Sequence, residues 1–218
     1  MGSFYGNVLV ARACEAVVPL LDGQGVRGFA LPAGPEHTVI HPDPETSGPD
    51  LAGPLSKLLA APALGMYLFD SDVLVMTLFE NGDLRHSYDS FPGYFDEPED
   101  DGGDPPSVAD PPSVEEPFEW PEPMGADPDA FLPLAAGPVD RAALESVLRG
   151  IPIDPEDGEH GRYVFADAQH FDAMDCLRLN APRLTTGYRY LAQGALPYGT
   201  TADDLILLGG ARRPTART

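Results

Sequence analysis

Three aspartates are the candidate chemical groups of this sequence. Asp70 and Asp72 are two residues apart, so in an extended strand their side chains lie on the same face. Asp89 closes a predicted hairpin that starts just after Asp72, which places all three carboxylates at one end of a sheet. Carboxylate oxygens suit a hard divalent cation, and a carboxylate pair can also act as general acid and base. The trio is therefore a candidate ligand or cation site; the alternative is a polar turn with strand-end caps.

Aromatic residues form a second candidate set, for contact with a partner. The motif Phe91-Pro92-Gly93-Tyr94-Phe95 predicts a turn with aromatic side chains on both sides. The only tryptophan lies in an acidic, proline-rich stretch, where it is suited to docking on a partner or to folding back on the body. Aromatic side chains are enriched at protein interfaces, although packing in the core explains the same residues. The candidate contact residues are Tyr88, Tyr94, Phe95, Trp120, Tyr188 and Tyr190.

Metal and cofactor motifs are missing from the sequence. His37 and His41 are four residues apart, which on a strand separates them by about 13 Å, too far to chelate one ion. Cys14 and Cys176 lack the spacing of a zinc or redox site, so buried structural thiols are expected. Residues 23–28 match GxGxxG, but they follow a helix and precede a strand, the reverse of the order that dinucleotide binding requires. We predict no metal and no cofactor.

The charge of the chain separates the partners it can bind from those it cannot. There are 13 Lys and Arg against 35 Asp and Glu, which gives a formal net charge of -22. A field of this sign repels phosphates, so nucleic acid is excluded as a partner. The same field attracts basic protein surfaces, so a basic protein is the predicted partner.

Much of this charge lies in one stretch. Residues 96–129 hold 13 acidic side chains and nine prolines, and no Lys or Arg. Within them, Asp104-Pro-Pro-Ser-Val108 recurs as Asp110-Pro-Pro-Ser-Val114. Proline excludes helix and central strand, and like charges extend a chain. We predict that residues 96–128 are an acidic, proline-rich, disordered linker or insert.

The compartment follows from other features of the composition. The first residues lack the basic and apolar regions of a secretory signal, and the apolar run at residues 73–79 is too short to cross a bilayer. Two cysteines are too few for a disulfide scaffold. Lys57 is the only lysine beside 12 arginines, which with many Ala, Gly and Pro residues indicates a bacterial, GC-rich genome. We expect a cytoplasmic protein without membrane contact.

Hydrophobic periodicity predicts the strands and helices that carry these residues. Strands are predicted at residues 4–11, 26–31, 37–40, 64–69, 73–80, 84–89, 163–165, 185–192 and 205–208. Helices are predicted at residues 14–21, 50–60, 141–148 and 168–177, the third capped by Asp140 and the fourth by Asp167.

The clearest local signal is Asn81-Gly82, the preferred turn of a two-residue hairpin. It places Phe79 opposite Leu84, residue 77 opposite residue 86, and Val75 opposite Tyr88. The first strand is apolar on both faces and is predicted to be central, whereas the second is amphipathic and is predicted to lie nearer an edge.

The element order predicts an α+β fold with a mostly antiparallel sheet and helices packed on one side. Residues 1–95 and 129–210 are the N-terminal and C-terminal parts of one body, interrupted by the acidic insert at 96–128. Residues 211–218 are a basic tail that we expect to be disordered.

Four motifs together resemble a family of bacterial proteins. They are Asp70-Ser-Asp-Val-Leu74, Asn81-Gly-Asp83, Tyr88-Asp-Ser-Phe-Pro-Gly-Tyr-Phe95 and Gly187-Tyr-Arg-Tyr-Leu191. The resemblance covers residues 4–95 and 139–208 and skips the insert. It implies one folded unit made of both parts. No activity is established for that family, so the resemblance assigns no catalytic residue.

Two functional hypotheses stay open at this point. The first is a non-enzymatic binding or regulatory protein that acts through protein–protein contact, in the manner of an acidic inhibitor or immunity protein. The second is an enzyme or small-ligand binder that uses Asp70, Asp72 and Asp89, with or without a divalent cation. The negative charge and the lack of a complete catalytic motif favour the first.

Overall fold

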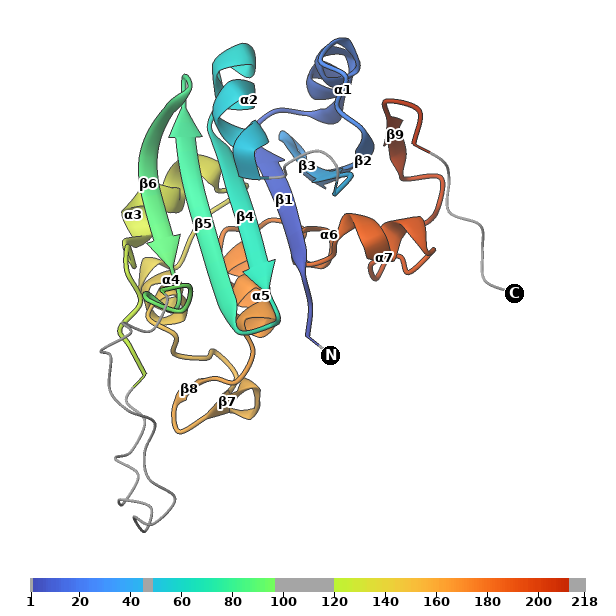
Figure 1. The fold of residues 1–218 in the computed structure, drawn as a ribbon. Coiled ribbons are helices and arrows are strands. Elements are labelled where there is room, and N and C mark those ends of the chain that lie inside the picture. The colour runs from blue at the N-terminus through green and yellow to red at the C-terminus, as the bar shows by residue number, and fades with distance from the viewer. Residues whose placement is uncertain (1, 45–48, 97–119, 212–218) are drawn as a thin grey trace, which may run out of the picture.

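A seven-stranded antiparallel sheet forms the centre of the molecule, with the strand order β6-β5-β4-β1-β3-β2-β9 (Figure 1). The computed structural model describes residues 2–44, 49–96 and 120–211. The strands of this sheet are β1 (Tyr5–Val10), β2 (Gly28–Gly34), β3 (His37–Pro42), β4 (Ala63–Phe69), β5 (Val73–Glu80), β6 (Asp83–Asp89) and β9 (Ile206–Leu208). A separate small hairpin pairs β7 (Gly158–Glu159) with β8 (Arg162–Tyr163). The predicted α+β class with an antiparallel sheet is confirmed.

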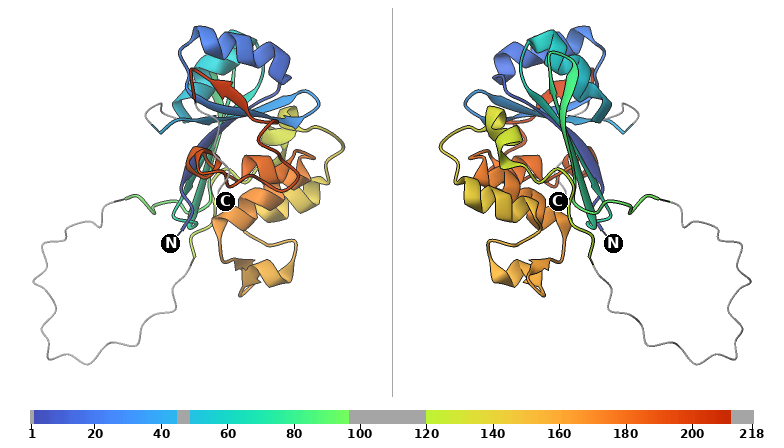
Figure 2. Two further views of the ribbon diagram at one scale, coloured as in Figure 1. Left: turned by 90° about the vertical axis from the view of Figure 1, so that its right-hand side faces the viewer. Right: turned by 90° about the vertical axis from the view of Figure 1, so that its left-hand side faces the viewer.

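Helices cover both faces of the sheet (Figure 2). On one face lie α1 (Cys14–Gly23) and α2 (Ala52–Leu59). On the other lie α3 (Pro128–Phe131), α4 (Arg141–Leu148), α5 (Ala166–Cys176), α6 (Ala181–Leu184) and α7 (Tyr188–Ala192). Short 3-10 turns occur at η1 (Pro49–Leu51), η2 (Leu132–Leu134) and η3 (Pro155–Asp157). Across the described residues, no helix has the length and apolar character needed to span a bilayer.

The expectation that the helices pack on one side is too narrow, and β1 gives the reason. Its alternate side chains point to opposite faces, and the successive apolar side chains of Val8, Leu9 and Val10 are all fully buried. Leu9 packs into the core beneath α4 and α5, whereas Val8 and Val10 pack beneath α1 and α2. A strand that is apolar on both faces requires cover on both, so the helices divide between them.

The two parts of the chain share one sheet and one core. β9, from the C-terminal part, pairs with β2 through Gly28 opposite Leu208 and Ala30 opposite Ile206. α4, α5 and α6 bury their apolar residues against β1, β4 and β5 (Figure 1). Most of the predicted insert, residues 97–119, lies outside the described residues, as does the tail 212–218. The last part of the predicted insert, residues 120–128, is structured and not disordered, because Met124 bridges to Asp89 and α3 begins at Pro128.

The predicted strand at residues 185–192 is wrong. This segment leaves α6 and forms α7, with Leu191 N donating to Gly187 O at 3.2 Å. The aromatic and threonine residues are typical of a strand, but the edge of β2 is already occupied by β9. Leu184 and Leu191 are instead buried from helical positions.

The cap predicted at Asp140 is confirmed, since its Oδ1 accepts from Ala142 N at 3.1 Å. Asp167 lies in the first turn of α5 rather than at its cap.

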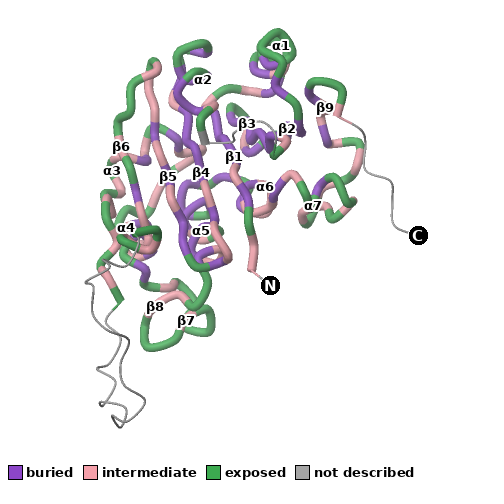
Figure 3. The backbone as a smooth tube through the Cα atoms, in the orientation of Figure 1, coloured by how far each residue is buried: buried purple, intermediate pink, exposed green. Residues whose placement is uncertain are grey.

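The β5–β6 hairpin has the predicted turn and a different register. Phe79 faces Leu84 as predicted, but the register then shifts by one residue, so that Leu78 faces His86. This β-bulge at Arg85 moves every later side chain of β6 to the opposite face. Tyr88 therefore faces Met76 instead of Val75 and is completely buried. As predicted, β5 is interior and β6 is an edge strand. Figure 3 shows the buried inner strands and the more exposed edge at β6.

Candidate functional site

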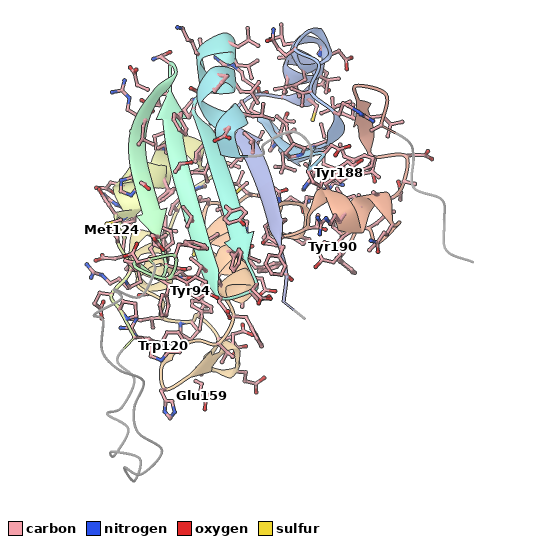
Figure 4. The ribbon with its side chains drawn as sticks, viewed as in Figure 1. Tyr94, Trp120, Met124, Glu159, Tyr188 and Tyr190 are labelled. Atoms are coloured by element: carbon pink, nitrogen blue, oxygen red, sulfur yellow. The ribbon has the colours of Figure 1, made fainter. Side chains whose placement is uncertain are left out.

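A cleft of about 300 Å³ opens where the chain leaves β6 and where it returns at residue 120. Five parts of the chain line it: the β4–β5 turn, the segment after β6, residues 120–123, Gly150 after α4, and the region from β8 to α5. Tyr94 and Trp120 lie at this lower end of the sheet (Figure 4). Its lining includes Asp72, Phe91, Tyr94, Trp120, Arg162 and Tyr163. We call this site the aromatic cleft.

Three aromatic rings meet at right angles in the wall of the aromatic cleft. The ring centroids of Phe91 and Tyr94 are 5.5 Å apart with an interplanar angle of 88°. Those of Phe91 and Trp120 are 5.6 Å apart with an angle of 83°. Edge-to-face contacts of this kind are favourable for aromatic rings. The predicted turn provides the geometry, since Tyr94 N donates to Phe91 O at 3.2 Å and Gly93 adopts a φ of 85°.

The three candidate aspartates have three different roles. Asp72 lines the cleft, and its Oδ2 accepts from Tyr94 Oη at 3.1 Å. Asp70 Oδ1 accepts from Gly2 N at 3.1 Å, and Asp89 Oδ1 accepts from Phe91 N at 2.9 Å. Thus Asp89 supports the turn that carries the aromatic rings, and only Asp72 faces the cleft. Within residues 2–44, 49–96 and 120–211, no group of three or more His, Cys, Asp or Glu residues is placed to hold a metal ion.

In the Asp72–Tyr94 hydrogen bond, the proton belongs to the Tyr94 hydroxyl. Loss of solvent around the hydroxyl, together with the neighbouring Asp72 carboxylate, raises the pKa of Tyr94. Near neutral pH the phenol therefore keeps its proton and donates a hydrogen bond to the Asp72 carboxylate. The pair presents a fixed negative charge at the wall of the cleft.

Arg162 and Glu122 complete the site, and sequence reasoning missed both. Arg162 Nη2 lies 2.6 Å from Glu122 Oε1, which ties β8 to the chain returning from the acidic segment. The two residues are 40 positions apart in regions without regular periodicity. No local pattern marks such a pair. Asp72 and Arg162 are the charged side chains that line the cleft, and Glu122 pairs with Arg162 beside it, so the three groups together carry a formal charge of about -1.

A buried polar cluster forms the floor behind the cleft. Gln169 lines the cleft, and its Nε2 donates to Tyr88 Oη at 2.8 Å and to Val147 O at 2.7 Å. Tyr88 Oη in turn donates to Leu148 O at 2.9 Å. Burial raises the pKa of Tyr88. Tyr88 was a candidate contact residue, but its complete burial makes it a support of the floor and not part of a surface.

The aromatic residues expected to form one surface are divided between two places. Phe95 and Tyr94 are neighbours, with ring centroids 5.2 Å apart. Tyr188 and Tyr190 lie on α7, far from Tyr94 and Trp120 (Figure 4). The ring of Tyr188 stacks on Phe29 with centroids 5.2 Å apart, which is a packing role. The structure thus brings together Asp72, Tyr94, Phe95 and Trp120 of the predicted set.

The cysteines and the central histidines lie in the interior and outside the cleft. Cys14 and Cys176 are buried free thiols, and burial raises the pKa of Cys176 to about 11. His170 Nδ1 lies 2.8 Å from Tyr5 Oη, and burial lowers its pKa to about 3. His41 Nδ1 lies 3.0 Å from Asn7 Oδ1, and its pKa is likewise lowered to about 3. These imidazoles and thiols are therefore uncharged near neutral pH.

No family model, curated protein or solved structure matches this chain. The resemblance suggested by the four motifs therefore assigns no role to any residue, and the function is argued from the aromatic cleft.

Proposed function

We propose that this chain is a non-enzymatic binding protein that acts by contact with a basic protein, as an acidic inhibitor or immunity protein covers its target. The observation that carries the proposal is a set of exposed apolar side chains that line the aromatic cleft or adjoin its lining residues in the chain, on a protein of net charge -22. We call these residues the apolar rim: Phe95, Trp120, Ile151, Val164 and Phe165.

The apolar rim has the composition of an interface. Trp120 and Phe165 are 52% and 56% exposed, which is unusual for large aromatic side chains. Each rim residue either lines the cleft or directly follows or precedes a residue that does. Exposed aromatic groups around a concave site are the arrangement found at the centres of binding surfaces.

Charge complementarity supports a basic partner. A net charge of -22 steers positively charged surfaces toward the chain and repels nucleic acid. The free thiols at Cys14 and Cys176 suit a reducing compartment, which supports action in a bacterial cytoplasm.

The second candidate function is a small-ligand binder or enzyme. One observation favours it: the volume of about 300 Å³ lies at the lower end of the range for small-molecule sites, and Asp72 and Tyr94 line it. In this case the cleft alone, and not the rim, would determine binding.

The test is a titration with labelled peptides that are rich in Lys and Arg, and with acidic peptides of equal length. We expect the basic peptide to bind, and its affinity to fall as salt rises. Phe165→Ala removes a rim contact and should weaken binding by about tenfold. Tyr198→Ala is the matched control, because Tyr198 is 93% exposed and does not line the cleft.

Two outcomes would contradict the proposal. The first is a basic peptide that does not bind at low salt. The second is binding that Phe165→Ala leaves unchanged, because contact would then depend on charge alone. Circular dichroism of each variant confirms that the fold is retained.

A further inference from the structure

We infer that the aromatic cleft is a receptor for one guanidinium group, supplied by an arginine side chain of the basic partner. The inference rests on the proposed function and names the chemical group that the cleft recognises. It requires aromatic faces, a carboxylate, a suitable local charge and a suitable size.

The aromatic wall provides faces for a flat cation. Phe91 stands edge-to-face with both Tyr94 and Trp120, so the three rings form two perpendicular corners. A ring face carries the negative part of the aromatic quadrupole and attracts a cation within about 6 Å of its centre. Tryptophan attracts cations most strongly, and guanidinium stacks on aromatic faces better than ammonium because it is planar and weakly hydrated.

Asp72 provides the counter-ion. Tyr94 Oη donates to Asp72 Oδ2 at 3.1 Å. This hydrogen bond orients the carboxylate and links it to the aromatic wall. Asp72 is exposed to solvent at the cleft, so an incoming donor can reach it. A guanidinium can place its parallel N–H groups on one carboxylate while its plane rests against a ring.

Arg162 does not cancel this charge. Its guanidinium is paired with Glu122 Oε1 at 2.6 Å, and the pair holds the cleft wall together. Asp72 is then the charge that remains for a ligand. The arrangement favours a cation over an anion, even though an arginine lines the cleft.

The size of the cleft suits one side chain. At about 300 Å³ it lies at the bottom of the range of small-molecule sites. Gln169, at the floor, has its amide nitrogen committed to Tyr88 and Val147, so the floor is fixed. Trp120 and Val164 of the apolar rim line the cleft, and such apolar contacts would exclude water around a central anchor, as neighbouring contacts do around interface hot spots.

The experiment uses Trp120 as the reporter, since it is the only tryptophan in the chain. The full chain is titrated with Gly/Ser peptides that differ in one central residue: arginine, citrulline, lysine or glutamate. Citrulline has the shape of arginine without its charge. We expect the arginine peptide to change the emission in a saturable way, and the citrulline peptide to bind at least about tenfold more weakly.

Matched variants assign the binding to the cleft. Asp72→Asn should weaken binding of the arginine peptide by about tenfold, and Tyr94→Leu should do the same through loss of a ring. Asp83→Asn changes the same charge at the distant hairpin turn and should have no effect, because Asp83 is exposed and does not line the cleft. Thermal unfolding confirms that each variant is folded.

Several results would overturn the inference. Equal binding of arginine and citrulline peptides would exclude a charge-selective site, and equal binding of lysine would exclude guanidinium selectivity. Preferred binding of the glutamate peptide would make Arg162 the anchor instead.

Failure of the inference is distinguishable from failure of the proposed function. In one case, the polybasic peptide still binds through Phe165 but the single-arginine peptide does not bind. That result would contradict the guanidinium site and still support the proposed function. In the opposite case, the single-arginine peptide binds in the cleft but binding of the polybasic peptide does not depend on the rim. That result would support the guanidinium site and contradict the proposed function.

Discussion

Buried histidines make the stability of this protein depend on pH, and burial lowers the pKa of His37 as well as those of His41 and His170. Burial lowers the pKa of His41 and of His170 to about 3, whereas an unfolded histidine titrates near 6.5. Above pH 6.5 each histidine is neutral in both the folded and the unfolded state, so it does not change the free energy of unfolding. Below it the unfolded state binds protons that the folded state does not, so the free energy of unfolding falls as pH falls toward about 3.

We therefore predict that His41 and His170 each remove about 2 kcal/mol of stability between pH 7 and about pH 5. Urea unfolding at the two pH values measures the loss. The net charge changes as well, so the comparison is made with His41→Asn, which should be less stable at pH 7 but less sensitive to pH. A surface control is His160→Asn, since His160 is exposed. If the free energy of unfolding of His41→Asn depends on pH as strongly as that of the unsubstituted protein, His41 is not a source of the pH dependence.

Single residues differ in how far the sequence predicts them. Asp72, Tyr94 and Trp120 were identified because a carboxylate between strands, an aromatic turn and a lone tryptophan are local signals. Arg162 and Glu122 were not, because their ion pair exists only after two distant segments are folded together. Local chemistry predicts which groups are available, and the tertiary fold decides which of them meet.

At the scale of elements, the bulge in β6 determines which face Tyr88 occupies. The Asn81-Gly82 turn fixes the hairpin, and the bulge then adds one residue to β6. The strands were predictable because their apolar residues alternate or run together. The bulge was not, because its position depends on the burial of Tyr88 against Met76 rather than on any residue at the bulge itself.

We predict that deleting Arg85 destabilises the protein by more than about 3 kcal/mol. The deletion removes the extra residue, so the rest of β6 shifts by one and Tyr88 leaves the core. Arg85→Ala is the matched control. It removes only exposed contacts with Glu80 and Asp83, which should cost less than about 1 kcal/mol. Chemical denaturation compares the two variants, and equal losses would contradict the role assigned to the bulge.

At the scale of the whole molecule, charge and site adjoin in the chain. Residues 97–119 contain nine of the 35 acidic side chains and no basic ones. They begin three residues after Tyr94 and end one residue before Trp120, and both of these line the cleft. A dense negative segment is therefore tethered at both ends to the proposed binding site. Charge so placed raises the rate of encounter with a basic partner more than it strengthens the final contact.

We predict that replacing these nine acidic residues by Asn and Gln lowers the association rate of a basic peptide several-fold at low salt. The dissociation rate should change little, because the contacts in the cleft are retained. At about 300 mM salt the difference should shrink, since the screening length then falls well below 10 Å. Stopped-flow fluorescence of Trp120 measures both rates. Asp72→Asn should show the opposite pattern, with a faster dissociation and a nearly unchanged association, because its charge acts at contact. An effect of the nine substitutions on dissociation alone would mean that the acidic segment contributes to the bound interface rather than to steering.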